Sequence, residues 1–493
     1  MTTESGGCGP LSGCGPLSTL DDGSEKTLAP LLASCQHLVK SNGSILGKDI
    51  AEQMCGAYKT LSSVLPPSVQ HTGPAFLASI DGRLPLEHSA VAPFLEEIGH
   101  VLHGLNVGRG SRVALVLPNG PELALAILAV SQWAAVVPLS ATGASQELAA
   151  DLQRCGADLV IGPYSAGPLP VTSEKSAIDN ETDLNHPDPL QELAHKYGVM
   201  TSTTPRDWTV FRNIQETADS LQIPFCGLVP DPETAGPFRL VAATTTKKTR
   251  SAFRVRMSYE SLAVPKVSDE YNTDKEEEEE QNALNSTNPT IHMANDGSLV
   301  SGESRLAPNS GADEALVLFT SGTTGNKKLV AHQMADLLVA ATTIALSWQL
   351  QPTDVNCNLM PLFHVGGIVR QVYAPLVSGG SVICCPSFDA DIFWALLQRE
   401  AFNWYYAAPT MHSIILQTGK ALLATSPIDE RTNKLQSFKL KMIANAAGGL
   451  LPSLAEELRD TFHAAILPRY GPQPFFLFVC HPFFWSCVMA LSS

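Results

Sequence analysis

Apolar stretches with the spacing of helices and strands alternate along the chain from about residue 75. The pattern predicts a helix over residues 90–105 and a strand over 113–117, followed by a Pro-Asn-Gly-Pro turn. A further helix over 146–155 and a further strand over 159–161 come next. Apolar strands separated by helices are typical of parallel pairing in a sheet that is covered on both faces. The predicted fold class is therefore α/β.

The longest apolar stretch covers residues 123–139 and includes the polar Gln132. A membrane-spanning helix needs roughly 20 apolar residues. Because this stretch is shorter and ends just after Pro138, we expect a buried helix followed by a strand, and no membrane association.

The acidic composition argues against a nucleic-acid partner. The 493 residues contain 32 Lys and Arg against 48 Asp and Glu, which gives a net charge of −16. A surface with this charge repels a phosphate backbone. The 11 cysteines form no C-x-x-C pair, and the first residues lack the basic and apolar pattern of a leader. We therefore expect free thiols in a reducing compartment, with the cytoplasm as the default location.

Changes in composition predict five parts of the chain. Residues 1–70 form a variable, partly disordered extension in which GCGPLS occurs twice, because dense Gly and Pro oppose regular structure. A first α/β subdomain covers 71–267 and a second covers 313–471. Between them, 268–312 contains KEEEEEQ, which is typical of an acidic, disordered insertion. Residues 472–493 form an aromatic tail without a charged side chain.

The strongest chemical signal follows the apolar strand expected over 315–319. The sequence there is Thr320-Ser321-Gly322-Thr323-Thr324-Gly325-Asn326-Lys327-Lys328, and a helix is expected from about residue 332 to 350. Glycines allow backbone N–H groups to approach an anion, hydroxyls add donors, and lysine adds positive charge. The pattern predicts a phosphate-binding loop, with a Ser/Thr-rich surface turn as the alternative. The Walker A spacing is absent.

This loop resembles that of the adenylate-forming enzymes, which comprise acyl-CoA synthetases, luciferases and peptide-synthetase adenylation domains. The family has proline where this chain has Lys327 and usually glycine where it has Leu329. The family's lysine falls on Lys328, with Lys327 as the alternative. The resemblance covers about residues 75–471, through further stretches at 108–122, 137–139 with 147–148, 360–367, 375–380, 405–412, 444–452 and 469–471. It implies the large N-terminal domain of an acyl-CoA synthetase, with mixed sheets and helices on both faces in two subdomains.

The resemblance also implies a role for individual residues. His364 would lie beside the carboxylate-substrate pocket and, with Lys328, would be catalytic. The alternative for His364 is a structural histidine. Tyr470 would stack on adenine, or else be a core aromatic. The residues implied to bind ATP are Thr320, Ser321, Gly322, Thr323, Thr324, Gly325, Lys328, Ala447, Gly448, Gly449 and Tyr470, with Thr324 also contacting Mg²⁺. For 447–449 the alternative is an ordinary βα turn.

The activity implied by the resemblance is AMP-dependent ligation. A fatty or other acyl carboxylate would react with ATP and Mg²⁺ to give an acyl-adenylate, and coenzyme A would then displace AMP. A peroxisomal location is compatible with the resemblance, although the chain shows no targeting tripeptide at Ser493.

The resemblance ends near Gly471, where the family continues with a Thr-Glu pair that holds Mg²⁺. Here the sequence continues with Pro472 and Gln473 instead. We therefore expect a truncated form that lacks this glutamate, the small C-terminal domain and its catalytic lysine. The alternatives are a nucleotide-binding pseudoenzyme or truncated gene product that acts as a binding module, and a membrane-tethered scaffold that uses the aromatic tail.

Overall fold

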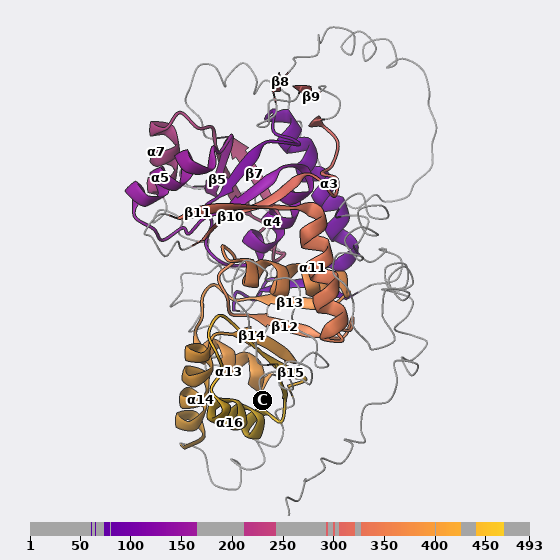
Figure 1. The fold of residues 1–493 in the computed structure, drawn as a ribbon, viewed down its shortest axis with the longest axis vertical. Helices are drawn as coiled ribbons and strands as arrows, with labels where there is room; N and C mark the ends of the chain where they lie inside the picture. Colours follow the sequence, from indigo (N-terminus) through magenta and orange to yellow (C-terminus); the bar gives the residue numbers. More distant parts are fainter. Residues whose placement is uncertain are drawn as a thin grey trace, which may run out of the picture.

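The computed structural model describes residues 61, 65, 73–78, 80–164, 212–242, 292–293, 299–300, 305–320, 327–399, 401–424 and 440–467 (Figure 1). Nearly all of the expected N-terminal extension and the whole aromatic tail lie outside these residues. Within the described part, no helix combines the length and the apolarity needed to cross a bilayer.

The first sheet contains seven strands in the order β11-β10-β4-β3-β5-β6-β7. The five inner strands run parallel, and the edge strands β7 and β11 run antiparallel to their neighbours. The strands are β3 (Arg112–Leu115), β4 (Ala135–Pro138), β5 (Leu159–Pro163), β6 (Phe225–Pro230), β7 (Phe238–Ala242), β10 (Glu314–Thr320) and β11 (Lys328–Gln333). Two helices, α5 (Ser145–Cys155) and α7 (Arg212–Ser220), pack on its outer face.

The second sheet also contains seven strands, in the order β16-β15-β14-β12-β13-β1-β2. All pairs are parallel except the edge pair of β1 and β2. The strands are β1 (Pro74–Ala78), β2 (Leu86–Glu87), β12 (Val355–Asn358), β13 (Ser381–Cys384), β14 (Trp404–Ala407), β15 (Met442–Asn445) and β16 (Ala465–Leu467). Its outer face carries α13 (Ala390–Gln398), α14 (Pro409–Ala424) and α16 (Pro452–Phe462).

One apolar core joins the facing sides of the two sheets. It contains side chains of α3 (His88–Gly104), α4 (Pro121–Trp133), α11 (Met334–Ser347), the π-helix η5 (Gly366–Tyr373) and α12 (Ala374–Val377). Every residue of α4 is buried, which explains why its sequence is apolar on all sides. The predicted α/β class is confirmed, as is the prediction that residues 123–139 form a buried helix followed by a strand. Figure 1 shows α4 and α11 with the β3 sheet on one side and the β12 sheet on the other.

The helix predicted from residue 332 begins later, and a strand precedes it. The chain returns from the loop as β11, antiparallel to β10, with Lys328 opposite Thr320. The α11 helix starts at Met334, where Gln333 and Asp336 form a capping box. Residues 332 and 333 belong to β11 and not to the helix, because pairing with a neighbouring strand overrides local helical spacing.

Sheet membership does not follow the order of the chain. The early strands β1 and β2 belong to the second sheet, and the later strands β10 and β11 belong to the first. The two expected subdomains therefore exchange strands. Asn309, within the range 268–312 expected for the acidic insertion, is fully buried, and its amide donates to the backbone carbonyl oxygens of Ser131 and Ala134.

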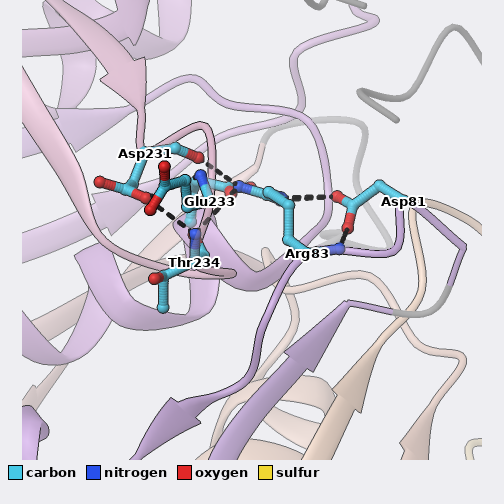
Figure 2. Close-up of polar contacts among 6 residues, drawn as sticks. Asp81, Arg83, Asp231, Glu233 and Thr234 are labelled. Atoms are coloured by element: carbon cyan, nitrogen blue, oxygen red, sulfur yellow. Dashed lines mark hydrogen bonds and ion pairs between the residues drawn. The ribbon is translucent and has the colours of Figure 1, made fainter. Parts of the chain in front are cut away.

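A buried ion cluster around Arg83 joins three segments of the chain, and Figure 2 shows its contacts with Asp81 and with the turn from Asp231 to Thr234. Its guanidinium lies 2.7 Å from a carboxylate oxygen of Asp81 and 2.5 Å from one of Glu122, and all three side chains are at most 4% exposed. Arg83 also donates to the carbonyl oxygen of Asp231, whose own carboxylate closes the turn at Thr234. Burial alone would lower the pKa of Arg83, but the charges of Glu122 and Asp81 raise it above its usual value. The cluster connects the β1–β2 loop, the start of α4 and the β6–β7 turn.

We predict that Arg83→Met lowers the free energy of unfolding by about 3–5 kcal/mol, because two carboxylates are left buried without their cation. Urea unfolding at neutral pH measures the loss. Lys420→Met, which breaks the exposed ion pair with Glu457, serves as the control and should cost less than about 1 kcal/mol. Equal losses of unfolding free energy in the two variants would show that the buried ion cluster of Arg83 does not stabilise the fold.

Candidate functional site

The carboxyl ends of the parallel strands of both sheets meet at Asn119. This residue follows β3, and its amide donates to the carbonyl oxygens of Met360 (3.3 Å) and Cys385 (3.1 Å). Its side-chain oxygen accepts from the backbone N–H of Leu362 at 2.9 Å. Met360 and Leu362 follow β12, and Cys385 follows β13. Ligand sites of open α/β sheets lie at carboxyl ends of strands, so this junction marks the candidate site.

The segment that Asn119 holds leads directly to His364. The side chain of His364 is exposed, and its ring lies 4.6 Å from that of Phe363. The surrounding protein still removes part of its hydration and lowers its pKa below the usual value, which favours neutral imidazole. Gly367 packs so closely that an added Cβ would lie 2.5 Å from the carbonyl oxygen of Pro361. Gly367 belongs to the eight-residue π-helix η5, which begins two residues after His364, and π-helical turns are frequent at functional sites.

The structure describes both ends of the predicted phosphate loop. Thr320 ends β10 and Lys328 begins β11, and the Thr320 hydroxyl donates to the carbonyl oxygen of Lys328 at 3.4 Å. Residues 321–326 lie outside the described part, so Ser321, Gly322, Thr323, Thr324 and Gly325 stay predictions. In the order of the first sheet, β10 lies two strands from β3. At about 4.8 Å per strand, the loop base is about 10 Å from the strand that leads to Asn119.

The two neighbouring lysines differ in their surroundings. Lys327 forms ion pairs of 2.6 Å with both Glu147 and Asp151. Lys328 is exposed, and its ammonium forms no ion pair with any residue that the structure describes. Of the two alternatives left by the sequence, Lys327 is held by carboxylates, and phosphate binding by Lys328 stays a prediction.

The segment expected to line adenine is an exposed turn after β15. Ala447 has φ = 56°, in the left-handed region that costs a non-glycine residue energy, and such strain clusters at functional sites. Asn445 donates to the carbonyl oxygen of Gly448 at 2.7 Å and fixes the turn. No heavy atom lies within 4 Å of an added Cβ at Gly449, so the backbone there faces open space. Tyr470 lies outside the described residues and stays a prediction.

No group of three or more His, Cys, Asp and Glu side chains in the described ranges has the arrangement of a metal site. The expected Mg²⁺ contact, Thr324, lies outside those ranges. Mg²⁺ binding therefore stays a prediction.

His412, in the 405–412 stretch, is a buried neutral histidine. It is fully buried, and its Nδ1 lies 3.2 Å from the hydroxyl of Tyr405. Burial lowers the pKa of His412 to about 4 and raises that of Tyr405 well above its usual value. The hydrogen bond therefore joins two neutral groups, the Tyr405 hydroxyl and the His412 imidazole.

Sequence reasoning missed Asn119 and the acidic partners of Lys327. The Pro-Asn-Gly-Pro motif indicated a turn, but only the distant segments Met360–Leu362 and Cys385 reveal what the amide binds. Glu147 and Asp151 have i, i+4 spacing on α5, which was the available signal for a cation partner.

The sequence profile of the AMP-binding enzyme family matches residues 86–481. This is most of the chain, and the chain belongs to the AMP-binding enzyme family. The match continues past Gly471 to His481, into the aromatic segment that we expected to be unrelated to the family.

Similar proteins include CoA ligases. The chain is 30% identical over 183 residues to the oxalate–CoA ligase of Arabidopsis thaliana, which covers 37% of this chain and 34% of that ligase. It is 27% identical over 160 residues to the mitochondrial malonate–CoA ligase ACSF3 of Mus musculus, covering 32% and 27%. The chain thus spans about a third of the length of these relatives. The crystal structure of apo MatB from Rhodopseudomonas palustris is similar in fold, with a TM-score of 0.50 and 17% identity over 84% of this chain and 59% of MatB.

We predict that Asn119→Ala lowers the free energy of unfolding by about 2–4 kcal/mol, because three hydrogen bonds of about 0.5–1.5 kcal/mol each are lost. Amide hydrogen exchange at Leu362 should accelerate, since its N–H loses its acceptor. Gln153→Ala, at an exposed position of α5, is the control and should change stability by less than about 0.5 kcal/mol. Unchanged exchange at Leu362 in Asn119→Ala would contradict the junction.

We also predict acid destabilisation from His412. The folded-state pKa of about 4 lies below the usual 6.5, so the full contribution is present above pH 6.5 and is lost as pH falls towards 4. Between pH 7 and pH 4.5, wild type should lose about 2 kcal/mol more unfolding free energy than His412→Gln, given 1.36 kcal/mol per pKa unit. Urea unfolding at both pH values measures the difference, in which the effects of other groups cancel. Equal losses would show that His412 is not held neutral.

Proposed function

We propose that this protein is an adenylate-forming acid–CoA ligase that activates a carboxylic acid with ATP. One observation carries the proposal. Lys328, at the exposed base of a hydroxyl- and glycine-rich loop, lies at the end of the first sheet where its parallel strands finish, and Asn119 joins that end to the segment that contains His364. Lys328, a cation suited to phosphate, and His364, a histidine suited to a pocket wall, would then act at the same ends of the strands. Membership in the AMP-binding enzyme family supports the same activity.

In the proposed reaction, a carboxylate oxygen attacks the α-phosphorus of ATP and pyrophosphate leaves. The thiolate of coenzyme A then attacks the acyl carbonyl carbon, and AMP leaves with the electron pair of the broken C–O bond. Lys328 and the N–H groups of the loop would stabilise the phosphate charge, which is the main task in such transfers. Mg²⁺, when bound, would neutralise further phosphate charge.

The adenine would lie along the exposed turn Ala447–Gly449. The open space at Gly449 and the fixed carbonyl of Gly448 fit a flat, hydrogen-bonding ring. For the acid, the oxalate and malonate named for the relatives are the first candidates, followed by fatty acids. Neutral His364 would favour a polar contact with the substrate without adding a fixed charge.

The test is carboxylate-dependent exchange of labelled pyrophosphate into ATP, with oxalate, malonate and a fatty acid each supplied in turn. We predict exchange with at least one acid, and a loss of about 10²–10³-fold in Lys328→Ala, because one preorganised charge partner is removed. Lys420→Ala is the control and should stay within about twofold of wild type, since its ion pair with Glu457 is exposed and lies outside the site.

A folded protein that shows no exchange with any acid but is stabilised by ATP would support a binding module instead. If the rate of pyrophosphate exchange is unchanged in Lys328→Ala, Lys328 does not contribute to phosphate binding.

A further inference from the structure

Three charged residues on one side of α5 hold Lys327 at both ends. Its ammonium lies 2.6 Å from Glu147 and 2.6 Å from Asp151, and its backbone carbonyl accepts from the Arg154 guanidinium at 3.2 Å. These three partners follow one another at i, i+4 and i+7, the spacing of one helix face. The ammonium also lies 5.7 Å from the ring centroid of Phe319, within range of a cation–π contact.

Asp151 makes this arrangement more than a surface ion pair. Its side chain is 12% exposed, and it lies on the same buried face of α5 as Leu148 and Leu152. A buried carboxylate is costly without a cation. The ion pair between Asp151 and Lys327 is therefore held in one geometry, whereas an exposed ion pair is not. Partial burial lowers the pKa of Lys327, but Asp151 and Glu147 raise it above its usual value overall. Lys327 therefore stays charged and tied to α5.

The anchoring of Lys327 determines where Lys328 points. Side chains alternate between the two faces of a strand. Phe319 and Leu329 pack with α5 on the outer face of the first sheet, whereas Leu316 and Leu318 belong to the core between the sheets. Lys327 shares the α5 side with Leu329, so Lys328 leaves the strand on the side of the second sheet. That is the side on which Asn119 joins the two sheets.

We propose that Lys327 is a positioning residue for nucleotide binding: its anchorage to α5 fixes the backbone so that Lys328 presents its ammonium to the triphosphate at the junction of the sheets. The inference rests on the proposed function, because it assumes that Lys328 contacts ATP. Lys327 itself touches no ligand. Two ion pairs of its ammonium and one hydrogen bond to its backbone carbonyl hold the loop base in place.

The experiment compares binding of ATP and of adenosine by calorimetry in wild type, Lys327→Ala and Lys327→Arg. Adenosine lacks the phosphates, so it reports only on the base and sugar contacts. We expect Lys327→Ala to weaken ATP binding about tenfold and adenosine binding less than twofold, because the misplaced cation affects only the phosphates. Lys327→Arg, which can pair with Glu147 and Asp151, should restore ATP affinity to within about threefold of wild type.

Asp151→Asn provides a second route to the same test if Lys327→Ala does not fold. It keeps the size of the side chain and the lysine but removes one charge partner, and it should weaken ATP and spare adenosine in the same way. Lys420→Ala, which breaks an ion pair of 2.5 Å on α14, is the matched control and should leave both affinities unchanged.

The outcomes separate the inference from the proposed function. Wild type that binds no ATP would overturn the proposed function and the inference together. ATP binding by wild type that is unchanged in both Lys327→Ala and Asp151→Asn would overturn the inference alone. An equal loss for ATP and adenosine would also overturn it, because that pattern indicates general loosening rather than placement of Lys328.

Discussion

The site depends on one asparagine that satisfies backbone groups of two sheets at once. A strand that ends leaves N–H and C=O groups without ladder partners, and such groups are costly if they stay unpaired near the core. Asn119 uses both amide hydrogens and its oxygen on three such groups, at Met360, Leu362 and Cys385. Neither sheet can move along the other without breaking these bonds, so the loop base and the His364 segment keep a fixed separation.

Strand exchange reinforces that constraint. Because β1 pairs with β13 and β10 pairs with β4, each sheet contains strands from both the earlier and the later part of the chain. Arg83 then fixes the β1–β2 loop to the start of α4 and to the β6–β7 turn. Buried ion clusters add little net stability compared with apolar packing, and their use here is consistent with a role in register. The exchange of strands between the sheets thus holds the loop base and the His364 segment together, and the polar contacts of Arg83 add to this.

The sequence predicts the elements whose pattern is local. The helix α3, the buried helix α4 and the strands β3 and β5 follow from spacing alone, because each buries a continuous apolar face. It does not predict β11, whose pairing with β10 decides its conformation, nor the strand exchange, which depends on contacts between distant segments. The same limit applies to Asn119. Its neighbours in the sequence indicate a turn, whereas all three of its partners lie more than two hundred residues away.

The adjacent lysines show why one residue step matters at a loop base. A sequence register alone cannot separate Lys327 from Lys328, since both carry the same charge. The alternation of side chains in an extended chain separates them: Lys327, just before β11, contacts the acids of α5, so Lys328 leaves the strand on the opposite face. A proline at position 327 would fix φ through its ring, independently of salt, but it could not neutralise the buried Asp151. Lysine there couples loop geometry to ion pairs, one of them partly exposed, so the rigidity of this loop base should weaken as ionic strength rises.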